Sequence, residues 1–483
     1  MTTTSSSSDH SSSWYHLLSG RNGVYSLALA GGVALHAVNI YIVTTVMPSV
    51  VAEIGGLDYY AWSTTLFVVA SILGSALSVQ LLRRTGARGA YAAAVVLFAM
   101  GTAICSLAPS MPVLLIGRGV QGLGGGFLYA LAYSVIREVY PQCLWPRAIG
   151  LISAMWGVST LIGPAVGGAF AELGAWRAAF WALVPVIGMF GMIAWLVLPG
   201  RKAGTKGDRS VLPGRQLLLL TVAVLSVSAG STSTSLGINI AGLLLAALLI
   251  GLLFRIERIA SVRLLPTGTL ATSSPLAALY ATIALLVIGM QPDVFVPYFL
   301  QVLHEQSPLA AGYLAALMAM GWTAASIVSS GTGQRTAARL LVIGPLTVLS
   351  GLLILYFTLP LTSDGEAIAL APISCGLVLV GFGIGLAWPH LVTSVFENAP
   401  SSERDLAAGG VTTVQLSATA LGVAIAGMTA NLGGLTDPGG IAGASSAAIA
   451  LFLSFSLAPL IALLVVQRVL RHARRQMLTE QPN

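Results

Sequence analysis

Apolar residues occur along this chain in long runs that short polar, glycine or proline segments separate. Most runs reach about 20 residues, the length that an α-helix needs to cross a hydrocarbon layer roughly 30 Å thick. Fourteen runs are predicted to be membrane-spanning helices, at residues 24–51, 61–82, 90–108, 112–136, 147–170, 176–198, 215–231, 236–256, 275–303, 308–330, 338–360, 367–395, 406–432 and 443–469. The pattern therefore predicts an all-α membrane protein.

The polar segments group these helices as six, two and six. Residues 1–23 form a Ser/Thr-rich tail, which is predicted to be disordered because it cannot bury a core. The distribution of basic residues, described below, predicts that this tail is cytoplasmic. A first six-helix bundle is expected at 24–198 and a second at 274–470. The basic linker between them, 199–273, contributes two extra helices that we expect to be peripheral, and 471–483 is a second cytoplasmic tail.

Composition agrees with this interpretation, since 56% of the residues are hydrophobic and only 8% are charged. Ordinary soluble domains are roughly 25% charged. A net charge of +7 could indicate a nucleic-acid partner, but the basic residues are spread over alternate loops instead of forming one patch. We therefore expect membrane lipids, and no nucleic acid, around this protein.

The distribution of basic residues predicts the orientation of the chain. Of its 23 Lys and Arg residues, Arg118 lies inside a predicted helix and Arg177 in a loop on one side, so 21 remain for the other side (23 less 2). Cytoplasmic loops carry such an excess, which places both termini in the cytoplasm. The three cysteines form no disulfide framework or metal-binding spacing, and no metal site is expected.

One arginine interrupts the apolar run 112–136, within the stretch LLIGRGVQGLGGG. A charge near the bilayer core costs at least about 2.5–3.5 kcal/mol, so Arg118 is expected to face a bundle interior or a water-filled cavity. The same stretch contains G-x-G-x-x-G at Gly117, Gly119 and Gly122. A dinucleotide site requires a preceding strand, whereas glycines in an apolar helix let a neighbouring backbone approach closely, and we favour this second interpretation.

No motif of an enzyme active site is present, so neither catalytic residues nor a cofactor are expected. Without a nucleotide site, the available energy is an ion gradient, worth about 2.3 kcal/mol per charge per 100 mV. Secondary transport is therefore the predicted class of function.

Several motifs resemble the major facilitator superfamily, and specifically its fourteen-helix drug:proton antiporter family. They are IGRGVQGLGGG, similar to the arginine motif of the fourth helix, MWGVSTLIGPAVGG, similar to the antiporter motif of the fifth helix, AWRAAFWALVP, FVPYFLQVLHEQSPLAAGY, GFGIGLAWPH and VTTVQLSATALGVAIAG. The resemblance implies two six-helix bundles with two extra central helices. It also implies proton-coupled transport of a small molecule by a monomer in a bacterial inner membrane.

The fifth-helix motif has a physical interpretation of its own. Gly163, Gly167 and Gly168 remove side chains from one helix face, and Pro164 removes a backbone donor and kinks the helix. A bent, closely packed interface that can rock is expected. The resemblance implies that this helix seals the cavity against proton leak, and packing without a coupling role is the alternative.

Two positions depart from the family pattern. The family places an aspartate nine residues before a proline in the first helix, where this chain has Asn39 before Pro48. After the second helix, VQLLRRTGARG carries Val79 in place of a glycine and Arg83 in place of an aspartate. The proton-carrying role of the first position is therefore in doubt, and the gating salt bridge of the loop cannot form as in the family.

Asp293 is the carboxylate that lies deepest in a predicted helix. It is about ten residues, or roughly 15 Å, from the outer end of the run 275–303, and Arg118 is roughly 10 Å from the outer end of its own helix. The two side chains could share one depth, where Asp293 would perform the coupling that Asn39 cannot. Pro292 and Pro297 could break the helix there. The alternative is a misplaced helix boundary, with Asp293 near the outer mouth in water.

Other polar side chains in the predicted helices are candidates for cavity lining or substrate binding: His36, Asn39, Gln121, His390 and Gln415. His36 and Asn39 stand three residues apart on one helix face. Each of these residues could instead make only interhelical hydrogen bonds.

The leading hypothesis is a proton-driven exporter of amphipathic or cationic small molecules that works by alternating access between the two bundles. One alternative is an exporter or facilitator of a particular metabolite, siderophore or lipid. Another is a transporter-like sensor or scaffold that translocates nothing.

Overall fold

The computed structural model describes residues 14–200, 212–233, 235–271 and 274–479, and these are almost entirely helical. The first half holds α1 (Trp14–Leu18), α2 (Gly20–Ile54), α3 (Trp62–Ser106), α4 (Met111–Val139), α5 (Trp145–Glu172) and α6 (Trp176–Val197). Two helices follow, α7 (Gly214–Ser231) and α8 (Leu236–Ile259). The second half holds α9 (Pro275–Met290), α10 (Val296–Leu303), α11 (Pro308–Ser330), α12 (Gln334–Thr358), α13 (Ala367–Asn398), α14 (Arg404–Leu432), α15 (Gly440–Phe455) and α16 (Leu457–Thr479).

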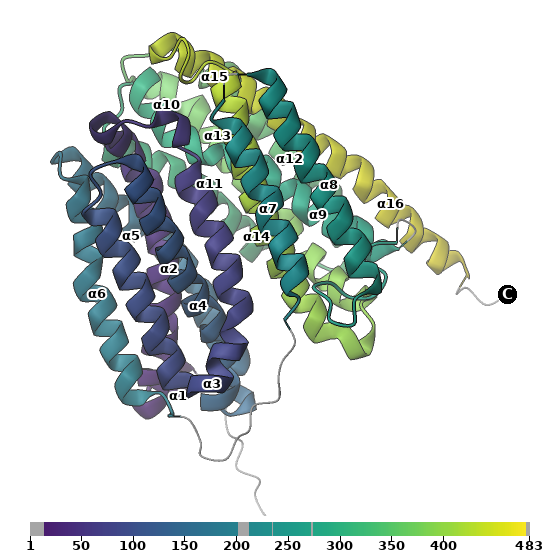
Figure 1. The fold of residues 1–483 in the computed structure, drawn as a ribbon. Coiled ribbons are helices and arrows are strands. Elements are labelled where there is room, and N and C mark those ends of the chain that lie inside the picture. The colour runs from purple at the N-terminus through teal and green to yellow at the C-terminus, as the bar shows by residue number, and fades with distance from the viewer. Residues whose placement is uncertain (1–13, 201–211, 234, 272–273, 480–483) are drawn as a thin grey trace, which may run out of the picture.

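The two halves lie side by side, and the ribbons converge at one end of the molecule and diverge toward the other (Figure 1). We call the end that holds the α2–α3 and α5–α6 turns the closed end. The opposite end, where α6 ends and α7 begins, is called the linker end. Across the seam between the halves, α5 packs against α11 and α3 packs against α14. The two halves therefore meet mainly through α3 and α5 of the first and α11 and α14 of the second, and α2 also packs against α10 and α11.

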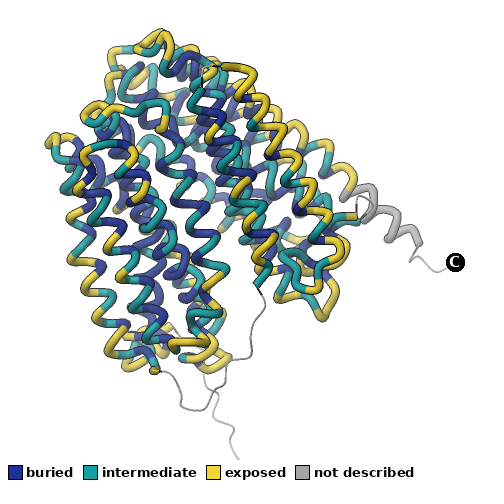
Figure 2. Tube along the Cα trace, in the orientation of Figure 1, coloured by how far each residue is buried: buried dark blue, intermediate teal, exposed yellow. Residues whose placement is uncertain are grey.

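Burial follows the layout of a membrane bundle. Buried residues line the inner faces of the helices and exposed ones the outer faces (Figure 2). Large apolar side chains are exposed on α8, where Leu244 and Leu248 are 66% and 68% accessible. Such faces are stable when lipid covers them, so this surface is that of a multi-pass membrane protein.

Within the described residues, 13 helical segments are long and apolar enough to cross a membrane. One of them, Leu57–Ser106, is 50 residues long and contains two of the helices predicted from sequence, 61–82 and 90–108. The predicted all-helical membrane fold is confirmed, and the count of fourteen crossings stays a prediction.

The long helix α3 consists of two limbs that meet at Gly86, whose backbone is not helical (φ 72°, ψ 173°). Both limbs run beside the glycine-rich part of α4. Gly122 of α4 lies against the backbone of Phe67 in the first limb, and an added Cβ on Gly124 would lie 2.5 Å from the Phe98 nitrogen in the second limb. The chain therefore passes this level of the bundle twice.

The first bundle begins earlier than residue 24. Trp14–Leu18 is a short helix whose Leu17 is fully buried, and Ser26 of α2 donates a hydrogen bond to the Leu17 carbonyl at 3.0 Å. Part of the predicted disordered tail is thus ordered against the bundle, because Leu17 supplies an apolar anchor. Residues 1–13, the first part of the basic linker (201–211), residues 234 and 272–273, and residues 480–483 lie outside the described residues.

Candidate functional site at the seam between the two bundles

Arg118 is fully enclosed between α4 and α3, with a side chain 1% exposed. Its Nε donates to the Ser63 carbonyl at 3.1 Å and its guanidinium to the Gln121 side-chain oxygen at 2.6 Å. Gln121 in turn donates to the Thr102 hydroxyl at 2.9 Å, which links both limbs of α3 to α4. Arg118 is therefore a fixed cation inside the first bundle, held by hydrogen bonds of the stronger, charge-assisted kind.

An aromatic stack extends from Arg118 toward His36 of α2. The guanidinium lies 4.2 Å from the centre of the Phe67 ring, and the His36 ring lies 5.2 Å from the same ring. Tyr129 and Trp156 stand 5.5 Å and 6.0 Å from His36. Cation–π contact at this distance is favourable, and the His36 imidazole fills a box of three aromatic rings.

Several buried polar atoms near this stack have no hydrogen-bond partner among the described residues. Asn39 is fully buried and neither atom of its amide is paired, and the Nδ1 of His36 is also unpaired. Leaving a polar group buried without a partner costs about 1–3 kcal/mol. Such unpaired buried groups are candidate contacts for a ligand or for water.

Asp293 lies where the helix of the ninth predicted span breaks. α9 ends at Met290, a 3-10 turn covers Gln291–Phe295, and α10 starts at Val296. One carboxylate oxygen of Asp293 is buried without a hydrogen-bond partner among the described residues, and Phe295, two residues further on, contacts Tyr60 of the first half. The break occurs because two prolines interrupt the helical hydrogen bonds, and it places an acidic group beside the seam.

An aromatic cluster joins the two halves beside Asp293. Tyr60, in the α2–α3 turn, stacks on Phe295 at 5.0 Å and meets Tyr298 edge-on at 5.8 Å, and Phe295 stacks on Phe299. Tyr60 is 1% exposed. These rings form a plug in the seam at the closed end.

The structure does not pair the two charged residues that the sequence placed at one depth. Two ion pairs of the described residues are Arg137–Asp405 and Arg177–Glu53, and neither includes Arg118 or Asp293. Arg118 instead bonds inside its own bundle. The rotation of each helix about its axis decides which side chains meet, and depth along the axis alone does not.

The fifth-helix motif lies against both halves. Gly163 and Gly167 face Tyr41, Ile42 and Thr45 of α2. Gly168 faces α11, where an added Cβ would stand 2.5 Å from the Leu309 Cα, and Pro164 lies against Gly312 of the same helix. The glycines therefore allow α5 to approach two helices at once, one in each half, at the closed end.

The remaining candidates lie in the second half. His390 is buried on α13, and its Nε2 lies 3.2 Å from the Thr332 hydroxyl, next to the end of α11. Gln415 is half-buried on α14. His390 thus has a partner in the turn after α11, which is the kind of hydrogen bond that the alternative to substrate binding predicts.

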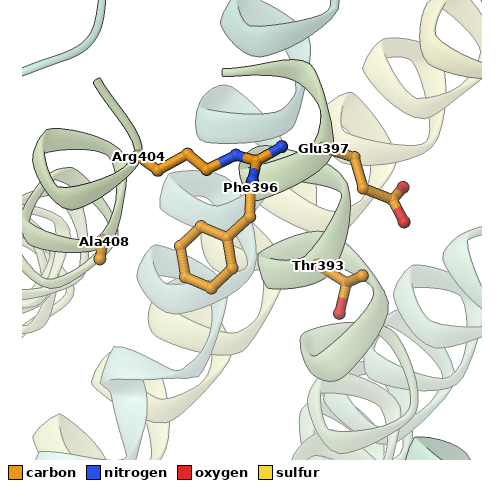
Figure 3. A pocket seen from close by; sticks show the side chains of 5 residues that line it. All are labelled: Thr393, Phe396, Glu397, Arg404 and Ala408. Carbon is orange, nitrogen blue, oxygen red and sulfur yellow. The ribbon is translucent and has the colours of Figure 1, made fainter. Parts of the chain in front are cut away.

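An open pocket of about 400 Å³ lies at the linker end between α13 and α14 (Figure 3). Its lining combines an aromatic ring with two charges of opposite sign, from Thr393, Phe396, Glu397, Arg404 and Ala408. Nearby, the Arg137–Asp405 pair spans the two halves at 3.6 Å with both side chains largely exposed. At this end the halves therefore meet through a solvated pair instead of packed backbone.

Sequence reasoning missed Tyr41, Tyr60 and Phe295. Aromatic residues in apolar helices carry no positional signal by themselves, because most of them pack in cores. The helix break next to Asp293 was signalled by its two flanking prolines.

Two helical halves, buried polar groups along their seam and an apolar outer surface define a polytopic membrane transporter. The chain belongs to the Major Facilitator Superfamily, whose sequence profile matches residues 29–423. The predicted superfamily is therefore confirmed.

Relatives and solved structures agree with this assignment. The chain is 37% identical over 427 residues to a probable multidrug-efflux transporter of Mycobacterium tuberculosis strain H37Rv, covering 87% of this chain and 90% of that protein. It is 26% identical over 373 residues to Multidrug resistance protein 3 of Bacillus subtilis strain 168, with coverages of 74% and 70%. The crystal structure of the POT family transporter PepTSo superposes with a TM-score of 0.67 at 14% identity, over 94% of this chain and 99% of that one.

Proposed function

We propose that this protein is a proton-coupled exporter of amphipathic or cationic small molecules. The similarity to proteins named as multidrug-efflux transporters supports export of drug-like molecules. The observation that carries the proposal is Asp293, an incompletely paired carboxylate at a helix break beside the seam. A carboxylate in this position can exchange a proton for a cationic group as the halves rock.

Arg118 has a separate role in this proposal. It supplies a fixed positive charge to the first bundle, because a guanidinium stays protonated and its hydrogen bonds hold it in place. His36, Asn39, Gln415 and His390 are proposed contacts for substrate or water. The glycines and proline of α5 are proposed to keep the closed end sealed while the linker end is accessible.

We propose that the closed end faces the outside of a bacterial inner membrane and that both termini are cytoplasmic, as the excess of basic residues at the linker end supports. The protein is proposed to act as a monomer surrounded by lipid. Reporter fusions after Glu305 and at the C-terminus should then give opposite signals, and matching signals would contradict this topology.

Transport by the purified protein in proteoliposomes tests the coupling role. Asp293→Asn should retain exchange of a fluorescent cation but lose accumulation driven by a pH gradient, whereas Asp364→Asn, in an exposed loop, should behave as the parent does. Unchanged gradient dependence in Asp293→Asn would eliminate this residue as the coupling group. Binding of the cation without any flux in the parent protein would instead support a sensor.

Arg118→Ala is a second test of the same proposal. It should abolish transport while folded protein remains in the membrane, and Arg118→Lys should rescue poorly because lysine lacks the planar fork that reaches both Ser63 and Gln121. Normal transport by the alanine variant would remove Arg118 from the mechanism.

A further inference from the structure

The two extra helices are attached to the second half of the protein at both ends. At the closed end, Asn431 of α14 donates to the Ser231 carbonyl of α7 at 2.8 Å. At the linker end, Thr267, in the loop after α8, donates its backbone N–H and its hydroxyl to Glu403 at 2.6 Å and 2.7 Å. The helix pair α7–α8 therefore belongs mechanically to the second half.

The loop after α8 is in turn fastened to the helix pair itself. Glu257 of α8 is buried and accepts the backbone N–H groups of Leu264 and Leu265. Gln216 of α7 donates to the Val262 carbonyl at 2.9 Å. The loop after α8 is therefore hydrogen-bonded both to Glu403, next to α14, and to the helices α7 and α8.

At the closed end, α7 also reaches the first half. Trp62, the first residue of α3, donates its indole N–H to the Ser228 carbonyl of α7 at 3.0 Å. The second bond of Asn431 goes to the Asp58 carbonyl in the α2–α3 turn at 3.0 Å. One turn before Asn431, Gly427 of α14 lies against Ala61, the residue that precedes α3.

These bonds use groups that a helix end leaves unpaired. The last four carbonyls of an α-helix have no partner within the helix, and Ser228 and Ser231 are among the last four residues of α7. Both residues are nearly fully buried. The Ser228 carbonyl accepts from Trp62 of the first half and also from the Ser231 hydroxyl at 2.7 Å, and the Ser231 carbonyl accepts from Asn431 of the second half.

We propose that α7 is a strap that extends the second half across the seam and holds the first half in place while the closed end is shut. Opening this end separates Ala61 from Gly427, so it must break Trp62–Ser228 and Asn431–Asp58, whereas Asn431–Ser231 stays within the second half. This differs from the peripheral role expected from sequence. It concerns the conformational equilibrium and does not depend on which molecule is exported.

A distance measurement across the closed end tests the strap without any transport assay. Spin labels at Leu173→Cys in the first half and Ile368→Cys in the second occupy positions 76% and 84% exposed, in a background with Cys143→Ser and Cys375→Ser. The distribution of distances between the two labels is recorded by pulsed electron–electron double resonance on protein in lipid nanodiscs. The parent should show mainly the short distance of the closed end.

Trp62→Phe removes only the indole donor, and Asn431→Ser shortens the amide out of reach of both carbonyls. Each should raise the ratio of open to closed populations by about threefold to tenfold, the size expected for one or two neutral hydrogen bonds. The matched controls are Trp181→Phe, at an exposed tryptophan of α6, and Thr413→Ser, at a half-buried position of α14. These should leave the distribution unchanged.

Unchanged distributions in both Trp62→Phe and Asn431→Ser, in protein that still elutes as a folded monodisperse species, would overturn the proposal. An equal shift in Trp181→Phe would do so as well, because it would show a general loosening. If Asn431→Ser fails to fold, Asn431→Gln, which keeps the amide on a longer stem, takes its place beside Trp62→Phe.

Discussion

The guanidinium of Arg118 bonds to the side-chain oxygen of Gln121 one turn further along α4, and the amide of Gln121 carries the link on to Thr102. A cation in the membrane interior is thereby satisfied without a carboxylate. The guanidinium is therefore held in place by the neutral amide of Gln121. The orientation of that amide depends in turn on the Thr102 hydroxyl in the second limb of α3.

Replacing Gln121 with leucine should destabilise the first bundle. The substitution removes an acceptor from a buried cation, and hydrogen bonds to charged groups are worth about 1.5–3 kcal/mol. Thermal unfolding in detergent should show a clear decrease in melting temperature, with a smaller decrease for Thr102→Val, which removes only the outer link. Equal melting temperatures for Gln121→Leu and the parent would show that Arg118 finds another partner.

Gly168→Ala should prevent full closure between α5 and α11. The new Cβ would stand 2.5 Å from the Leu309 Cα, which is backbone and cannot rotate away. Overpacking of this kind costs about 1–3 kcal/mol. Gly157→Ala on the same helix is the control, since no atom lies within 4 Å of its added Cβ.

The readout for this pair is the reactivity of a cysteine placed at Thr45, which is buried beside Gly167 and Gly312. A small maleimide should label it faster in Gly168→Ala than in Gly157→Ala, with Cys143 and Cys375 replaced by serine. Identical labelling rates would mean that α11 tolerates the added methyl group without separating.

The two ion pairs should differ in their value to the fold. Arg177 bonds to Glu53 and to the Ala108 carbonyl at 2.8 Å, joining two turns of the first bundle, with side chains 32% and 49% exposed. Arg137–Asp405 is longer and more exposed. Arg177→Ala should therefore cost about 1 kcal/mol of stability and Arg137→Ala less than about 0.5 kcal/mol.

Unfolding midpoints at low and high salt check this difference. Salt should reduce the contribution of the Glu53 pair, so the gap between the parent and Arg177→Ala should narrow at high ionic strength. If Arg137→Ala lost more stability than Arg177→Ala, the closed end would not be the more firmly held of the two ends.

His304 should make the closed end sensitive to acid. It is almost fully buried between two turns, with Nδ1 2.8 Å from the Ser363 hydroxyl and Nε2 3.0 Å from the Leu359 carbonyl. Burial lowers the pKa of His304 below its ordinary value of 6.5, while the bond to Leu359 opposes this effect in part. Because the native state favours the neutral ring, its stabilising contribution is complete above pH 6.5 and is lost as the pH falls toward the lowered pKa.

Melting temperature measured between pH 7.5 and pH 5 checks this sign. The parent should lose stability on acidification more steeply than His304→Gln, which cannot titrate. A parallel decline in both proteins would assign the acid sensitivity to other groups.

The sequence predicted those features that depend on one helix at a time. The spans follow from hydropathy, and the glycines of α4 and α5 predicted close packing because a missing side chain has the same consequence whichever helix approaches. The break next to Asp293 was indicated by Pro292 and Pro297. The partners across helices could not be predicted, because the rotation and pairing of helices depend on all contacts together. The hydrogen bonds that Trp62 and Asn431 make to α7 were therefore not predicted.

The non-helical backbone at Gly86, between the two limbs of α3, bears on whether the number of membrane crossings is odd or even. If Leu57–Ser106 counted as one crossing, the total would be odd and the two termini would lie on opposite sides of the membrane. Both limbs pass the same level of α4, so the predicted fourteen crossings count each limb as one crossing; the total is then even and the termini are predicted to share a side. Glycine adopts the positive φ of this reversal without the steric cost that other residues incur. In the predicted topology, the change of backbone direction at this one glycine therefore determines on which side of the membrane every later loop lies.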